Sequence, residues 1–494
     1  MAVYLVLAAY FAILAGIGVV ASRRIRDLDD FYVGGKKLGY WVVAFSARAT
    51  GESAWLLLGL TGLGAMVGLS ALWVVVGEVL GVGIAWFVMA DRFKHQTDEC
   101  RAVTVPDYLV AKHAPRKSDP NHKRIRVLAA GILVLFITIY VSAQIDATGK
   151  AFESFLGWNY YSGITAGFGI VLLYTMFGGF VAVSWSDLFQ GTIMLVGLVA
   201  IPVFAVMSIP SDVALSTSIG ASNPELLTLT GAGGLTFQNV WIIVSYLAVG
   251  LGFLGSPQVF VRFMSLKDPR EIKKGRWVAI TYTILTDTAA VLAGFLGRFI
   301  LVPGGQNPES ILGNAAEGVL PAIVEHLFPV VIVGIFVAAV LAAIMSTIDS
   351  LLVVASSAVT RDYYQQLVHP ETPGSELTGM SRWVTLGIAV FALVIAVSVS
   401  LLSPDRTVFW FVIFGWSGIA SCFCPVIILT LFWKEYNARG VIWTMIGGLI
   451  SVPLFKFGAS ALPIVGEAFN ALGEMAPSFV VAFIAGYVGS NWKS

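Results

Sequence analysis

One apolar stretch of this 494-residue chain carries four oxygen-bearing side chains within five residues: Ser346, Thr347, Asp349 and Ser350. Oxygen atoms are the ligands that hard cations prefer, and hydroxyl groups supply them without excess charge. Hydrogen bonds back to the preceding helical turn would explain the three hydroxyl groups. They would not explain Asp349, because a carboxylate inside a membrane span is costly and indicates function by default. We therefore expect this stretch to bind a cation, with sodium as the first candidate.

A second group of charges lies in the middle of the stretch 40–67, which reads SARATGESAW from residue 46. Arg48 and Glu52 are four residues apart, so they share one helix face and are expected to pair. The pair could lock the helix, or Glu52 could meet a cationic solute group or a proton. Asp187 also has two interpretations. It could be a helix N-cap or a residue on an ion path.

The composition of the chain indicates the kind of protein in which these residues lie. Hydrophobic residues make up 57% of the chain and charged residues 12%, and the mean hydropathy is +0.84. Soluble domains carry about a quarter charged residues, so we expect a polytopic membrane protein. The net charge of +1 offers no basic field for nucleic acid. There is no nucleophile–base set, no P-loop and no metal-ligand cluster, so we expect neither an enzyme nor a bound cofactor.

Thirteen stretches approach the roughly 20 apolar residues that a membrane helix needs. They are continuously apolar, which fits helices and not the alternating strands of a barrel. Their ranges are 3–22, 40–67, 71–90, 127–145, 160–182, 188–207, 238–261, 277–302, 328–358, 383–403, 407–433, 441–456 and 475–491.

The basic residues predict the orientation of these spans. Twenty-five of the 30 Lys and Arg residues fall on one side of the predicted membrane, counted in the loops after spans 1, 3, 7, 9 and 11 and at the C-terminus. The opposite loops 208–237 and 303–327 contain none. The positive-inside rule therefore predicts an external N-terminus and a cytoplasmic C-terminus in an inner or plasma membrane.

Two predicted spans contain residues that weaken a helix. Span 2 has Gly51 among polar neighbours, and span 7 reads GLGFLGSP from Gly250 to Pro257. Glycines can also serve close helix packing alone. The two spans are five apart, and five is odd, so units starting at spans 2 and 7 would have opposite topology. Paired broken helices in inverted repeats are typical of secondary transporters with a midplane site.

At these motifs the chain resembles the sodium:solute symporter family, and within it the sodium/proline symporters. The matching stretches are residues 29–39, 173–187, span 9 through Tyr363, and GWSG from Gly415 with Pro425. The resemblance covers about residues 5–450 and implies an all-α fold of thirteen transmembrane helices with a leucine-transporter-type five-plus-five inverted repeat. Residues 1–39 would form the first helix and its loop, 40–207 the first repeat, 208–433 the second, and 434–494 two C-terminal helices.

The resemblance also implies the site residues. A sodium ion would bind the main-chain carbonyls of Ala49, Glu52 and Ala343 and the hydroxyl groups of Ser346 and Thr347. A second cation or proton site would use Asp187, Asp349 and Ser350 with the same two hydroxyl groups. The expected substrate-binding residues are Arg48, Glu52, Ser53, Ala54, Tyr140, Val249, Phe253 and Pro257.

The pocket departs from the family pattern at four positions. Arg48 stands where the family has a glycine. Gly51 replaces an aspartate of the proline symporters, while Val249 and Phe253 replace a tryptophan and a tyrosine. Neighbouring helix residues point about 100° apart, so Glu52 does not simply stand in for that aspartate.

We expect a sodium-coupled symporter that imports a small organic solute, with proline or another amino acid as the default. The alternatives are a proton-coupled carrier of a charged solute, with H⁺ in place of Na⁺, and a transporter-like solute sensor. Glu78, Asp287 and Arg298 are further charges in apolar stretches to which no role is assigned. The expected partners are the solute, the ion and the lipid bilayer.

Overall fold

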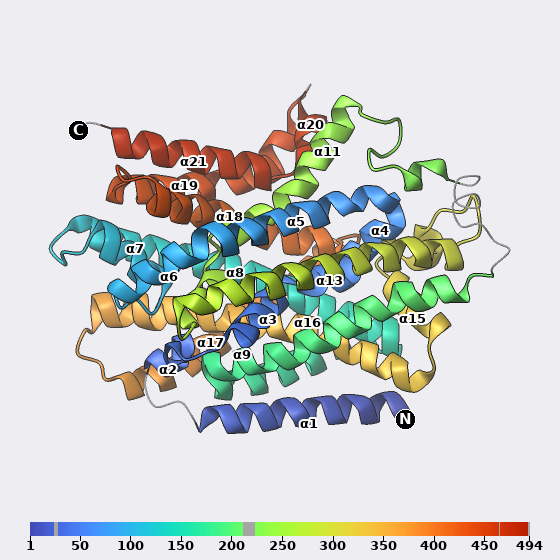
Figure 1. Cartoon of the computed structure of the whole chain (residues 1–494), viewed down its shortest axis with the longest axis horizontal. Helices are drawn as coiled ribbons and strands as arrows, with labels where there is room; N and C mark the ends of the chain where they lie inside the picture. The colour runs from blue at the N-terminus through green and yellow to red at the C-terminus, as the bar shows by residue number, and fades with distance from the viewer. Residues whose placement is uncertain (24–27, 211–222, 464, 493–494) are drawn as a thin grey trace.

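The computed structural model is a bundle of long helices that run side by side along the horizontal axis of Figure 1. It describes residues 1–23, 28–210, 223–463 and 465–492. Within these ranges the one β-type contact is an isolated bridge between Leu38 and Leu266. Arg24 and Arg26, which contribute to the predicted charge bias, lie outside the described residues, as do residues 211–222 of the loop 208–237.

The first half of the chain forms the helices that correspond to the first six predicted spans. Their bounds are α1 (Ala2–Ser22), α2 (Leu28–Val33), η1 (Gly34–Lys36), α3 (Tyr40–Gly51), η2 (Trp55–Leu60), α4 (Thr61–Val67), η3 (Gly68–Ala71), α5 (Leu72–Ile84), η4 (Ala85–Met89), α6 (Ala90–Glu99), α7 (Val105–His113), α8 (Pro120–Leu156) and α9 (Tyr160–Ser208). Helix α9 covers spans 5 and 6, which join at Gly179, where φ is 53° and the backbone leaves helical geometry. Only glycine adopts this conformation at low cost.

The second half contains a second broken helix and the most buried helices. The bounds are η5 (Pro224–Leu227), α11 (Phe237–Ala248), η6 (Val249–Leu254), α12 (Pro257–Ser265), η7 (Pro269–Glu271), α13 (Ile272–Leu301), α14 (Glu309–Leu312), η8 (Asn314–Ala316), α15 (Val319–Leu327), α16 (Val330–Ser357), η9 (Ala358–Val368), α17 (Gly374–Leu402), α18 (Val408–Phe432), α19 (Ala438–Pro453), η10 (Leu454–Gly458), η11 (Ala459–Ala461), α20 (Gly466–Leu472) and α21 (Met475–Asn491).

The described chain has ten helices that are long and apolar enough to span a membrane, or eleven if α20 and α21, bent by 92°, count as one span. Part of the difference from the thirteen predicted spans arises at span 2. That span is interrupted, and α3 has only 12 residues. The chain is therefore an all-helical, multi-pass membrane protein.

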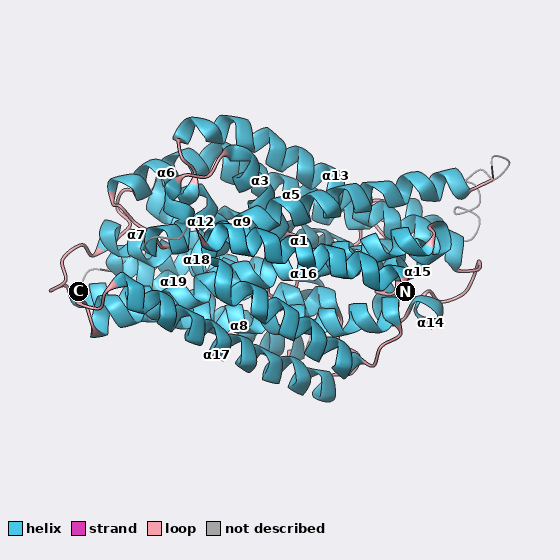
Figure 2. Cartoon of the chain, turned by 90° about the horizontal axis from the view of Figure 1, so that it is seen from below, coloured by secondary structure: helices cyan, strands magenta, loops and turns pink. Residues whose placement is uncertain are grey.

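Helices α16 and α18 lie at the centre of the bundle. In the most apolar 18 residues of each helix, 83% of the residues are buried for α16 and 89% for α18. The corresponding share for α1 is 17%. Figure 1 shows α1 along the lower edge of the bundle, which is the side from which Figure 2 is viewed. A polar residue on α16 therefore faces protein and not lipid, which is why its oxygen-rich stretch can form a site.

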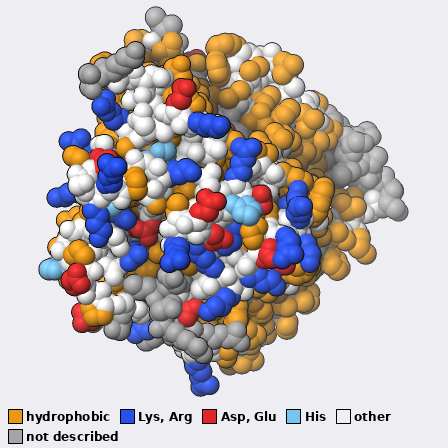
Figure 3. Space-filling model, turned by 60° about the vertical axis from the view of Figure 1, so that its left-hand side comes forward, with side chains coloured by type: hydrophobic (Ala, Val, Ile, Leu, Met, Phe, Trp, Pro, Cys, Tyr) orange, Lys and Arg blue, Asp and Glu red, His pale blue; other side chains and the backbone are white. Residues whose placement is uncertain are grey.

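The two ends of the bundle differ in charge. The N-terminus and the end of α21 lie at opposite ends in Figure 1. Lys and Arg side chains gather on the end that carries α6 and α7, and the flank beside it is hydrophobic (Figure 3). This distribution agrees with the charge bias found in the sequence.

Candidate functional site

The first helix break lies between α3 and η2. Glu52 leaves helical geometry with φ −94° and ψ 82°. The side-chain amide of Gln144, on α8, stabilises the break from the side. Its oxygen accepts the N–H of Ala54 at 3.1 Å, and its nitrogen donates to the Ser53 hydroxyl at 3.0 Å. The predicted interruption of span 2 is confirmed, whereas Gln144 was not predicted.

The second break separates η6 from α12. Gly255 has φ 155°, and a Cβ there would lie 2.9 Å from the main chain of α18, so glycine is needed for both conformation and space. The indole N–H of Trp416, on α18, donates to the carbonyl of Val249 at 3.1 Å. Pro257 then begins α12, a position that tolerates the missing N–H. The interruption predicted for span 7 is confirmed.

Oxygen atoms from α16 and α3 meet at the end of the first half-helix. The Ser346 hydroxyl donates to the carbonyls of Ala49 at 3.0 Å and Ala343 at 3.1 Å. The Thr347 hydroxyl donates to the carbonyls of Thr50 at 3.2 Å and Ala343 at 3.1 Å. All these residues are buried. This group of hydroxyl and carbonyl oxygens has the chemistry that a sodium ion requires.

The structure thus brings together four of the five predicted sodium ligands. The hydroxyl groups of Ser346 and Thr347 contact the carbonyls of Ala49 and Thr50 across the interface, whereas no contact to the Glu52 carbonyl is described for them. Glu52 as a main-chain ligand therefore stays a prediction. The Thr50 carbonyl was not predicted, although its place directly after Ala49 could have suggested it.

A guanidinium group lies at the predicted second cation site. Arg262, on α12, donates through Nη2 to Thr50 Oγ1 and Ser350 Oγ, both at 2.5 Å, and to Asp187 Oδ2 at 3.2 Å. Its Nε donates to the Ser46 hydroxyl at 2.9 Å. Arg262 was counted among the loop residues that determine topology, and this was wrong. It is buried, because the broken span continues to Ser265.

The structure excludes one of the two interpretations of Asp187. It lies inside α9, well past Gly179, and is fully buried. An N-cap role is therefore excluded, and Asp187 pairs with Arg262. Asp349 accepts a hydrogen bond from Ser350 at 3.4 Å through Oδ1, while its buried Oδ2 has no hydrogen-bond partner in the part of the chain that the structure describes.

On another side of α3, Arg48 meets three carboxylates. We call Arg48, Glu52, Glu78 and Asp287 the midplane cluster, after the position predicted for the helix breaks. The Nη2 atom of Arg48 lies 2.5 Å from Glu52, 2.9 Å from Glu78 and 3.9 Å from Asp287. The Thr286 hydroxyl lies 3.0 Å from Glu52 Oε1 and 3.1 Å from Asp287 Oδ1. The predicted Arg48–Glu52 pair is confirmed, and residues on α5 and α13 complete the cluster.

The phenyl ring of Phe253 explains the glycine at position 51. A Cβ on Gly51 would lie 2.6 Å from the ring of Phe253, which is closer than packing permits. The guanidinium carbon of Arg48 lies 4.7 Å from the centre of the same ring. Arg48, Gly51 and Phe253 therefore form one packing unit, so the departures from the proline symporter pattern at positions 51 and 253 depend on each other.

The remaining predicted substrate-binding residues line the two breaks. The Tyr140 hydroxyl approaches the Ser53 hydroxyl at 3.4 Å, and its ring packs edge-on against Trp416. All eight predicted residues are buried: Arg48, Glu52, Ser53, Ala54, Tyr140, Val249, Phe253 and Pro257. Trp416, from the GWSG motif, also contacts Phe253. The structure brings Arg48, Glu52 and Phe253 together on one side, and Ser53, Ala54 and Tyr140 on the other.

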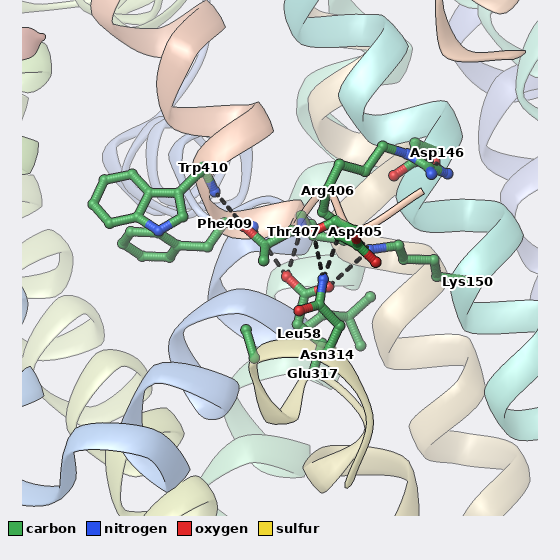
Figure 4. Close-up of polar contacts among 12 residues, drawn as sticks. Leu58, Asp146, Lys150, Asn314, Glu317, Asp405, Arg406, Thr407, Phe409 and Trp410 are labelled. Carbon is green, nitrogen blue, oxygen red and sulfur yellow. Dashed lines mark hydrogen bonds and ion pairs between the residues drawn. The ribbon is translucent and has the colours of Figure 1, made fainter. Parts of the chain in front are cut away.

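A second ion-pair group closes the end of the bundle that carries the segments 303–329 and 403–407. We call Asp146, Lys150, Glu317 and Arg406 the external cluster, after the side of the membrane predicted for these segments (Figure 4). Lys150 Nζ lies 2.9 Å from Glu317 Oε2. Arg406 and the Tyr160 hydroxyl both donate to Asp146. The cluster ties α8 to the segments that precede α15 and α18.

The carboxylate of Glu317 also caps α18. It accepts the backbone N–H groups of Val408 at 2.5 Å and Phe409 at 3.3 Å. Free N–H groups at a helix start favour such an anion. Phe409 in turn packs against Trp55, whose indole donates to the Gly51 carbonyl at 2.9 Å. The external cluster is thereby connected to the first helix break through two aromatic side chains.

At the opposite end, Asp362 of the predicted family motif joins three segments. It accepts hydrogen bonds from Thr104 at 2.8 Å and Arg126 at 3.1 Å. Arg126 also pairs with Asp107 at 2.8 Å. This group holds α7 and α8 against η9.

Comparison with known proteins places these features in a family. Residues 31–448 match the model of the sodium:solute symporter family. The osmoregulated proline transporter OpuE of Bacillus subtilis is 33% identical over 97% of this chain and 93% of its own length. A sodium/proline symporter of Staphylococcus aureus is 33% identical over 99% and 92%. A sodium-coupled sialic acid symporter superposes with a TM-score of 0.80 at 20% identity, covering 99% of this chain and 97% of that one.

Proposed function

The chain belongs to the sodium:solute symporter family, and from this premise we propose that its sodium ion binds between α3 and α16 and drives import of a small organic solute. It is a sodium-coupled transporter and not an enzyme. The observation that carries the proposal is the pair of hydroxyl groups on Ser346 and Thr347. They reach the carbonyls of Ala49 and Thr50 at the last turn before the break.

Sodium bound there couples to the solute through the geometry of the break. The ion replaces the hydroxyl–carbonyl hydrogen bonds and draws the end of α3 to α16. The next residues along the chain, Gly51 to Ala54, would line the solute pocket. An ion that fixes the end of α3 therefore also orders the residues that contact the solute. Coupling of this kind is worth typically about 1–3 kcal/mol, or about 5- to 150-fold in solute affinity.

Alternating access requires that the two ends of the bundle open in turn. The external cluster and the Phe409–Trp55 contact close one path to the break. The Asp362 group holds the other end. Opening outward would separate Glu317 from Lys150 and move the start of α18, which carries Phe409.

The membrane arrangement is proposed on the same basis. It has thirteen membrane crossings, with repeats over 40–207 and 208–433. This arrangement is consistent with both the broken helices and the charge bias. The N-terminus would then lie outside and the C-terminus inside. Both repeats contribute a break, at Glu52 and at Gly255.

Proline, the solute named for the relatives, is the reference compound for testing the function. The test is uptake into proteoliposomes with and without an inward sodium gradient, using proline and a panel of other amino acids and amines. The double variant Ser346→Ala/Thr347→Ala should raise the sodium concentration for half-maximal uptake at least about tenfold, because two ligands are lost. Ser398→Ala, on the exposed face of α17, is the matched control. Uptake that follows a proton gradient and ignores sodium would contradict the proposal and favour the proton-coupled alternative.

A further inference from the structure

The midplane cluster has more negative than positive groups. One guanidinium, on Arg48, faces the three carboxylates of Glu52, Glu78 and Asp287. Each of the four side chains is at most 1% exposed. An uncompensated carboxylate buried in this way is strongly unfavourable. The two excess carboxylates therefore require either protons or a cation that binds beside them.

Unpartnered atoms in the cluster show where such a cation would bind. Among the described residues, Glu52 Oε2, Glu78 Oε1 and Asp287 Oδ2 are buried acceptors without a hydrogen-bond partner, and Arg48 Nη1 is a buried donor without one. Buried polar atoms are normally satisfied, so these atoms require either protons shared between the carboxyl groups or a ligand. Three acceptors and one donor form a site for a positive group with a smaller anionic or polar part beside it.

The cluster is separate from the proposed sodium site. Arg48 and Glu52 point from α3 toward α5 and α13, whereas Ala49 and Thr50 contact α16. In the described residues no three acidic, histidine or cysteine side chains have metal-binding geometry. The guanidinium of Arg48 lies where the carboxylates meet, so a bare metal ion would have to displace it. A larger organic cation can instead hydrogen-bond to their outer oxygens.

The cluster also adjoins the predicted substrate-binding residues. Glu52 forms the break itself, and Arg48 lies on the ring of Phe253. An aromatic ring beside carboxylates suits an ammonium or guanidinium group, which both attract.

We propose that the solute carries a positive charge and that Glu78 and Asp287, with Glu52, bind its cationic group. The solute class is basic amino acids and amines, not neutral zwitterions such as proline. Arg48 Nη1 would bind a carboxylate on the solute where one is present. This inference rests on the proposed function, because it assigns the solute of the same transporter.

The experiment measures thermal unfolding of the purified full-length chain by tryptophan fluorescence, with six compounds added in NaCl and in KCl. They are L-lysine, L-arginine, cadaverine, agmatine, L-proline and glycine betaine. Sodium-dependent currents from proteoliposomes are then recorded with the same compounds. We expect at least one cation to raise the unfolding temperature and to give a current, and the two neutral compounds to do neither. Comparing each amino acid with its amine shows whether Arg48 also binds a carboxylate.

Two variants test the residues. Glu78→Gln and Asp287→Asn should each weaken binding of the active cation at least about tenfold, because a charged hydrogen bond is lost. Glu153→Gln, at an exposed position on α8, is the control. Stabilisation by sodium alone reports that each variant is folded, and it should persist in both.

Three outcomes would overturn the proposal. One is transport of proline or glycine betaine that both variants leave unchanged. Another is cation binding that neither variant weakens, and the third is a panel in which no cation acts. If sodium fails to stabilise the wild type while a cation still does, the sodium site is wrong and the solute assignment stands.

Discussion

The midplane cluster and the external cluster contain the same residue types but differ in their charge balance. In the external cluster two cations, Lys150 and Arg406, face two carboxylates, and Glu317 also caps α18. In the midplane cluster one cation faces three carboxylates. A cluster with equal numbers of positive and negative groups can hold segments together without a further partner. An unbalanced, fully buried cluster requires either protons or a positive ligand.

Burial adds to this contrast. The side chains of Lys150 and Glu317 are 22% and 10% exposed, whereas those of Arg48 and Glu78 are 1% exposed. Water therefore screens the external pair and compensates it when it breaks, as a gate requires. The midplane charges have no such compensation, so each must keep a protein or ligand partner. We therefore expect substitutions in the two clusters to change stability by different amounts.

The largest effect is expected from removing the one cation of the midplane cluster. Arg48→Met should destabilise the protein by about 3–5 kcal/mol, because it leaves buried carboxylates unpaired. The measurement is the unfolding temperature in detergent by tryptophan fluorescence. The double variant Arg48→Met/Glu52→Gln should recover part of the loss. Equal stability of Arg48→Met and wild type would show that the carboxylates do not depend on Arg48.

An intermediate effect is expected at the packing contact beside the cluster. Gly51→Asp should cost about 1–3 kcal/mol through overpacking against Phe253. Combining it with Phe253→Ala should restore stability, because the ring no longer fills the space. Purified yield and unfolding temperature measure both variants. If the double variant is no better than Gly51→Asp alone, the two positions are independent and the packing unit is disproved.

The smallest effect is expected in the external cluster. A double-mutant cycle with Lys150→Met and Glu317→Gln should give a coupling of about 0.2–1 kcal/mol, which falls as salt is added. Glutamine keeps an acceptor for the N–H groups of Val408 and Phe409, so the cycle isolates the charge. The readout is the unfolding temperature at several choline chloride concentrations. A coupling that salt does not reduce would place the pair in the same class as the midplane cluster.

Local patterns predicted the breaks and part of the site. Gly51 and the glycines before Pro257 mark the breaks by composition alone. Arg48 and Glu52 are four residues apart, so helix geometry pairs them. The hydroxyl groups of Ser346 and Thr347 were found because they interrupt an apolar run. The role of Arg262 was missed, because a basic residue near the end of a span has the same sequence signal whether it lies in a loop or folds back into the core.

The sequence by itself determined the helical, multi-pass character of the protein, its family and the places where helices are interrupted. These properties follow from composition and from residues close together in the chain. Only the tertiary structure showed that Glu78 and Asp287 join Arg48, that Gln144 supports the first break and that Arg262 reaches Asp187. The physical reason is that each contact joins separate helices. Helix periodicity tells which residues share a face, but packing decides which faces meet.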